Sequence, residues 1–87
     1  RRDLAFSLDG KLLAAWGTYG LKLYSLTNGR ALYREVNDRT LRCFAFFLDS
    51  RSYVMGHSKG RAVRWEVVTG NEIQSITISG AVPRVVQ

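Results

Sequence analysis

An internal repeat constrains this chain more than any other feature of its sequence. Residues 1–29 read RRDLAFSLDGKLLAAWGTYGLKLYSLTNG, and residues 41–70 read LRCFAFFLDSRSYVMGHSKGRAVRWEVVTG. Phe6 corresponds to Phe46, and the spacing between the copies grows from 40 to 41 residues after Gly60. This one-residue difference is predicted to fall within a loop, where a structural repeat tolerates it. Self-similarity at such a period indicates a repeat architecture in which each copy is one supersecondary unit.

Each copy consists of short apolar segments separated by tight turns. Asp9-Gly10 lies between two of them and is a strong hairpin signal, because glycine accepts a positive φ at no steric cost. The segment 12–16 is apolar at every position, so both of its faces need cover. The predicted strands are residues 4–6, 12–16, 21–26 and 30–36 in the first copy, and 41–47, 52–55, 61–67 and 72–78 in the second. Four antiparallel strands in each repeat, covered on both faces, are typical of a β-propeller blade.

The strand and turn text resembles the WD-repeat (WD40) family of propellers. The matching text is LAFSLDGKLLAAWG, YGLKLYSLTNG, FAFFLDSRSYVMGHSKG and AVRWEVVTG, which covers essentially the whole chain. The resemblance implies an all-β, two-blade fragment of a larger propeller. Blade 1 is expected in residues 1–40, blade 2 in residues 41–83, and the start of the next blade's inner strand in residues 84–87.

The chain also departs from the pattern of that family. The Trp-Asp dipeptide is replaced by Tyr24-Ser25 and by Trp65-Glu66, the Gly-His falls on Val36-Asn37, and the loop aspartate falls on Arg39. These replacements remove the hydrogen-bond tetrad that stabilises many such blades. We therefore expect blades that are less rigid than is usual for the family.

One short motif suggests an enzyme, but its context argues against this. Residues 56–60, GHSKG, match the G-x-S-x-G nucleophile elbow, which requires a helix directly after it and a histidine base further along the chain. Strand-like RAVRWEV follows instead, and His57, inside the motif, is the only histidine. We interpret the segment as a loop and expect no enzymatic activity. With Cys43 as the only cysteine, no intrachain disulfide can form, and no metal or cofactor site is predicted.

The charge balance favours an acidic partner. The chain holds 13 Lys and Arg against 7 Asp and Glu, a formal net charge of +6, with the cations scattered along it. No apolar run is long enough to span a membrane and no signal-peptide pattern is present, so an intracellular location, cytoplasmic or nuclear, is expected.

Several basic residues share one predicted face of the disc. Arg2 and Arg42 each lie four residues before a repeat-equivalent phenylalanine, and Arg84 falls in the same slot of a third copy. In the WD-repeat family, the loops between outer and inner strands share a face with the loops between second and third strands, and partners often dock there. Mapped onto this chain, the charged residues of that face are all basic except Asp38. The predicted partner-binding residues are Arg2, Tyr19, Arg39, Arg42, His57, Lys59 and Arg84.

The function predicted from this face is that of a non-catalytic scaffold that binds an acidic or phosphorylated protein partner. An alternative is a face that binds nucleic acid or phosphate through the arc of arginines. A second alternative is that these arginines bind no partner. The starts of strands are exposed to solvent, and arginine is common in this chain. Because both blades also carry apolar residues on outward faces, we expect further blades of a longer chain, or self-assembly, to cover them.

Overall fold

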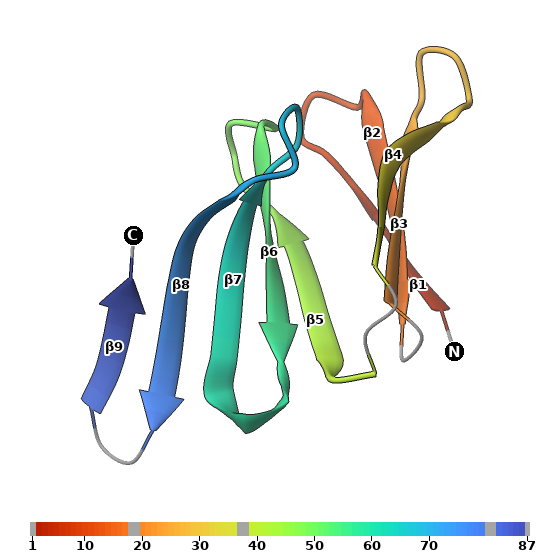
Figure 1. Ribbon diagram of the computed structural model, residues 1–87. Helices are drawn as coiled ribbons and strands as arrows, with labels where there is room; N and C mark the ends of the chain where they lie inside the picture. Colours follow the sequence, from red (N-terminus) through yellow and green to blue (C-terminus); the bar gives the residue numbers. More distant parts are fainter. Residues whose placement is uncertain (1, 18–19, 37–38, 80–81, 87) are drawn as a thin grey trace.

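The computed structural model describes residues 2–17, 20–36, 39–79 and 82–86, and these form two antiparallel sheets (Figure 1). Within each sheet, strands that are consecutive in the sequence pair with one another, so both sheets are simple meanders. Within the described ranges the only helical turn is a short 3-10 turn, η1 (Ser58–Gly60). The first sheet contains β1 (Arg2–Phe6), β2 (Leu12–Gly17), β3 (Gly20–Ser25) and β4 (Ala31–Val36). The second contains β5 (Leu41–Phe46), β6 (Ser52–His57), β7 (Arg61–Glu66), β8 (Glu72–Ser79) and β9 (Val82–Val86). The predicted all-β fold of two blade-like sheets is confirmed.

The sequence repeat is also a repeat of strand register. Each sheet aligns three corresponding residues across its first three strands: Phe6, Leu13 and Tyr24 in the first sheet, and Phe46, Tyr53 and Trp65 in the second. Both sheets also shift register between their third and fourth strands, next to Tyr24 and next to Trp65. The two sheets are therefore structural copies of one another.

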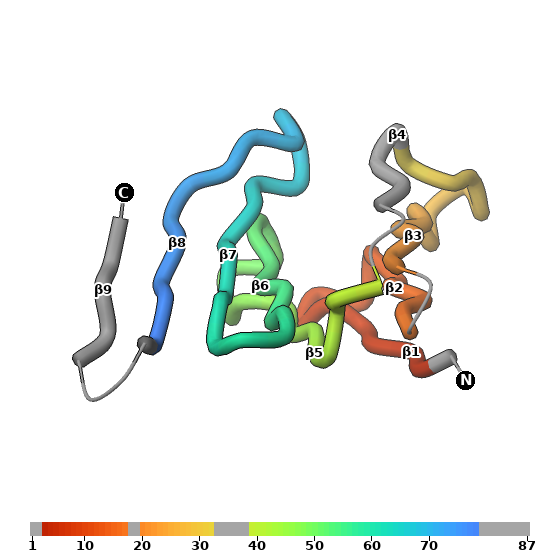
Figure 2. Tube along the Cα trace, turned by 60° about the horizontal axis from the view of Figure 1, so that its bottom comes forward, coloured from red at the N-terminus to blue at the C-terminus, as the bar shows by residue number. Residues whose placement is uncertain are grey.

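The hydrophobic core lies between the two sheets. The first sheet contributes Ala14, Leu21 and Leu23, and the second contributes Leu41, Phe44, Tyr53 and Met55. Strand β5 lies against β1 and β2, whereas β8 lies away from the first sheet, so that the sheets fan apart (Figure 2). This is the arrangement of neighbouring propeller blades around their inner strands.

Equivalent aspartates fix the turn after the first strand of each sheet. Oδ1 of Asp9 accepts a hydrogen bond from the backbone N–H of Lys11, and Oδ1 of Asp49 accepts one from that of Arg51, each at 2.9 Å. The Ser7 hydroxyl also donates to Asp9 at 2.6 Å. The Ser7 hydrogen bond most strongly lowers the pKa of Asp9, and the backbone N–H of Arg51 most strongly lowers that of Asp49. In both turns the ionised carboxylate is the stabilised form.

Acid is therefore expected to weaken the fold through Asp9 and Asp49. Because their folded-state pKa values lie below the usual 3.8, their stabilising contribution is complete above that pH and is lost as the pH falls through the lowered values. Urea unfolding of the parent chain should show a falling free energy of unfolding below about pH 4. The double variant Asp9→Asn, Asp49→Asn should show a shallower fall, and an unchanged pH dependence would contradict the assignment.

The end of the chain differs from the sequence-based prediction. Residues 84–87 were expected to begin the inner strand of a third blade, with a boundary at residue 83. In the structure, β9 is instead the fifth strand of the second sheet and pairs antiparallel with β8, with Arg84 opposite Thr77. The edge of β8 offers backbone hydrogen-bonding groups to whatever strand lies beside it, and the valine-rich segment of β9 supplies that strand.

Candidate partner-binding surface

Two loops of the second sheet bring basic residues together at one end of the molecule. Leu41, at the start of β5, pairs with His57 at the end of β6, so the connection into β5 lies beside the β6–β7 turn. We call residues 39–42 and 57–61 the basic end; it lies at the bottom of Figure 1. Neither segment contains an acidic residue. Four cationic side chains are exposed there: Arg39, Arg42, Lys59 and Arg61.

Hydrogen bonds join the two loops of the basic end. The backbone N–H of Ser58 donates to the carbonyl oxygen of Thr40 at 2.8 Å, and Oγ1 of Thr40 lies 3.0 Å from Nδ1 of His57. Nη1 of Arg42 donates to the carbonyl oxygens of Arg39 at 2.8 Å and of Leu41 at 3.2 Å. The loops are thus held in one arrangement, and Arg42 is positioned by its own backbone neighbours.

The opposite end of the sheets has mixed charge. Its turns hold Asp9 and Asp49 close to Lys11 and Arg51 in the sequence. Arg64 additionally pairs with Asp49 across 3.4 Å. Cations that lie beside carboxylates attract an acidic ligand less than cations without such neighbours, because the opposite charges compensate. The basic end is therefore the end better suited to an acidic ligand.

The structure gathers most, but not all, of the predicted binding residues. Arg39, Arg42, His57 and Lys59 lie together at the basic end, and Arg2 begins β1 opposite Gly17, at the corresponding end of the first sheet. Tyr19 and Asp38 lie outside the described residues.

Arg84 is placed differently from its prediction. It lies on β9, at the outer edge of the second sheet, and not at the start of an inner strand beside β1 and β5. The predicted arc of Arg2, Arg42 and Arg84 on three successive inner strands is thus not present in this arrangement.

Sequence reasoning missed Arg61 and Arg64. Arg61 is exposed and opens β7 directly after the β6–β7 turn, so its place beside that turn is the signal that could have identified it. Arg64 lies over the Phe47 ring at 3.7 Å from its centroid, and its Nε donates to the Ser52 hydroxyl at 3.0 Å. Its repeat equivalent is Leu23, a core residue, so an arginine at that position was the available signal.

The arrangement around Ser58 is not that of a nucleophile elbow. Ser58 lies in η1, and β7 follows it directly, where the hydrolase motif requires a helix. Among the described residues, no three His, Cys, Asp or Glu side chains are grouped as metal ligands. The same part of the chain contains no helix long and apolar enough to cross a membrane.

Comparison with known proteins does not assign the chain to a family. No family model matches it, and no curated protein matches it.

Proposed function

We propose that this chain is part of a WD-repeat propeller that acts as a non-catalytic scaffold, and that its basic end binds an acidic segment of a protein partner. The proposal depends on one observation above all. Two hydrogen-bonded loops expose Arg39, Arg42 and Lys59, and the described segments that form them, residues 39–42 and 57–61, contain no acidic residue. The duplicated strand register supports the propeller part of the proposal.

The geometry favours a carboxylate or phosphate ligand. A guanidinium group presents its N–H donors in a planar fork that matches these anions, and Arg42 is already oriented by two carbonyl oxygens. Preorganised groups lose less conformational entropy when they bind. Clustered positive charge also raises the association rate with an acidic partner.

Charge reversal at the basic end tests this function. The variant Arg39→Glu, Lys59→Glu is expected to weaken binding of a labelled oligo-glutamate peptide by about 10–100-fold, as measured by fluorescence anisotropy. None of the hydrogen bonds described above uses either side chain, so the fold is expected to persist. The matched control is Lys11→Glu, Arg30→Glu, which makes the same charge change at the opposite, exposed turns. If the control loses as much affinity as the basic-end variant, the binding surface has been misplaced.

A parallel titration with oligothymidylate separates the protein partner from nucleic acid. Binding dominated by phosphate contacts falls steeply with salt, with a slope of about −0.7 per neutralised phosphate for a single strand. We expect the parent chain to bind the peptide more tightly than the oligonucleotide at the same ionic strength. Tighter binding of the oligonucleotide, lost in the basic-end variant, would show a nucleic-acid site and refute the protein-partner proposal.

A further inference from the structure

The two sheets contact each other through different kinds of surface. The first sheet presents small and aliphatic side chains, among them Ala5, Ala14 and Leu23. The second presents aromatic side chains, Phe44, Phe46 and Tyr53, whose rings also contact one another with centroids 4.9–6.5 Å apart. The interface inside this chain thus sets mainly small and aliphatic side chains, together with Trp16, against an aromatic cluster flanked by Leu41 and Met55.

Because the two sheets are repeats, the positions equivalent to each inner face also occur on the outward side of the other sheet. In the first sheet Leu4, Phe6 and Leu13 occupy the positions of the three aromatic residues, and in the second sheet Ala45, Val54 and Arg64 occupy those of the three aliphatic residues. Because successive side chains alternate between the two faces of a strand, both copied sets point away from the existing interface. We call them the Phe6 face, formed by Leu4, Phe6, Leu13 and Tyr24, and the Val54 face, formed by Ala45, Val54, Ala62, Arg64 and Ile76.

The Phe6 face is exposed. Leu4 and Phe6 have 65% and 64% of their surface accessible, whereas Phe44, the repeat equivalent of Leu4, has 9%. Large exposed apolar residues that adjoin one another mark an interaction surface more often than isolated ones do. The contrast between equivalent positions therefore indicates that the Phe6 face lacks the cover that the second sheet receives from the first.

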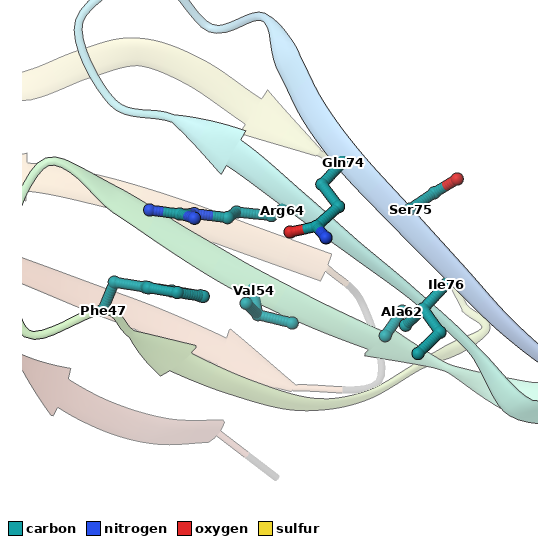
Figure 3. Close-up of a pocket in the computed structure, with 7 residues that line it drawn as sticks. All are labelled: Phe47, Val54, Ala62, Arg64, Gln74, Ser75 and Ile76. Atoms are coloured by element: carbon teal, nitrogen blue, oxygen red, sulfur yellow. The ribbon is translucent and has the colours of Figure 1, made fainter. Parts of the chain in front are cut away.

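The Val54 face contains a shallow pocket of about 200 Å³ (Figure 3). Val54, Ala62 and Ile76 line it from β6, β7 and β8, and Phe47 borders it after the end of β5. Arg64 crosses the pocket with its guanidinium against the Phe47 ring. An apolar hollow beside a planar cation suits an aromatic side chain, which can pack in the hollow and stack on the guanidinium.

We propose that the Val54 face of one molecule binds the Phe6 face of a second copy of this chain, head to tail. The two faces occupy the repeat-equivalent positions of the surfaces that already pack between the chain's own sheets, so a second copy can continue the same sheet-on-sheet contact. Such a contact is heterologous: each bound copy still offers one free face, so assembly continues until a ring closes or a filament grows. This association uses neither loop of the basic end, so it is tested separately from peptide binding there.

Two face-blocking variants test the proposal. Leu4→Glu, Phe6→Glu blocks the Phe6 face, and Ala45→Glu, Ile76→Glu blocks the Val54 face. Leu8→Glu, Leu48→Glu is the matched control, since these two leucines are 72% and 84% exposed in the turns. Analytical ultracentrifugation measures association, and circular dichroism confirms that each variant retains its strands. The parent and the control are expected to form species larger than a dimer, and each blocked variant is expected to be monomeric, with association weakened by about a hundredfold or more.

The decisive sample is an equimolar mixture of the two blocked variants. Each retains the face that the other lacks, so the mixture is expected to form a one-to-one dimer that grows no further. A mixture that stays monomeric, a monomeric parent, or a blocked variant that still dimerises alone would each overturn the head-to-tail arrangement. If a double variant loses its strands, a single substitution takes its place: Phe6→Glu for the Phe6 face, or Ala45→Glu for the Val54 face. The same results are expected of it, and the same results would overturn the proposal.

Discussion

Replacing Tyr53 with alanine is expected to lower the free energy of unfolding by about 3–5 kcal/mol, because it empties the centre of the only core shared by both sheets in the described structure. The Tyr53 side chain has no accessible surface. Its ring stacks on Phe44 with a centroid distance of 5.3 Å and meets Phe46 edge-on at 6.5 Å. Neighbouring rings held in a sheet relax only partly into the space that is left, so most of the cavity persists.

Urea unfolding followed by tryptophan fluorescence measures this loss. The comparison uses one protein concentration, since association also contributes to apparent stability. Leu13→Ala is the matched control, because Leu13 holds the equivalent position in the first sheet but is only half-buried. Its expected loss is about 1–2 kcal/mol. Tyr53→Phe, which keeps the ring and its contacts with Phe44 and Phe46, is expected to cost far less than Tyr53→Ala. Equal losses in Tyr53→Ala and Leu13→Ala would show that the interface between the sheets does not hold the fold together.

The sequence predicted the strands and the equivalent positions of the two copies well, because turn chemistry repeats at fixed spacing. Asp9 and Asp49 both mark a tight turn, and the positions of those turns determine which residues face each other on the flanking strands. The predicted equivalence of Tyr24 and Trp65 is therefore confirmed by the register. Their environments differ, however. Trp65 packs against the core, while Tyr24 lies on the Phe6 face, because equivalence between copies does not decide which face has a neighbour.

A local sequence pattern could not predict which sheet β9 joins. A valine-rich segment reads as a strand whether it opens a new sheet or extends the preceding one. The outcome depends on whether the edge of β8 is already paired, which is a property of the tertiary structure. Arg84 lies on β9, opposite Thr77, for the same reason.

The basic end was predictable in outline but not in detail. Meander topology alone places residues 39–42 beside residues 57–61, so Arg39, Arg42, His57 and Lys59 could be grouped from strand order. The bonds of Arg42 to two carbonyl oxygens depend on its rotamer and on the turn before it, which the sequence does not specify. Arg64 was missed because an arginine inside strand text reads as a solvated position, whereas here its guanidinium lies against Phe47.

Gly60→Ala is expected to destabilise the chain by about 2–5 kcal/mol, through two separate costs. Gly60 has φ +74°, a left-handed conformation that costs a residue with a Cβ about 1–2 kcal/mol. A Cβ at this position would also lie 2.5 Å from the carbonyl oxygen of Ile78, so the β6–β7 turn or β8 has to move. Displacement of packed backbone adds about 1–3 kcal/mol.

Gly10→Ala separates the two costs. Gly10 has the same φ of +74°, but a Cβ there meets none of the described residues' heavy atoms within 4 Å, so only the conformational cost of about 1–2 kcal/mol applies. Urea unfolding of both variants gives the steric cost as their difference. Because Gly60 closes the turn that carries Lys59, the same displacement is expected to weaken oligo-glutamate binding in Gly60→Ala and to leave it unchanged in Gly10→Ala. Equal unfolding energies would show that β8 yields without cost at Ile78, and equal peptide affinities would show that the position of this turn does not determine binding.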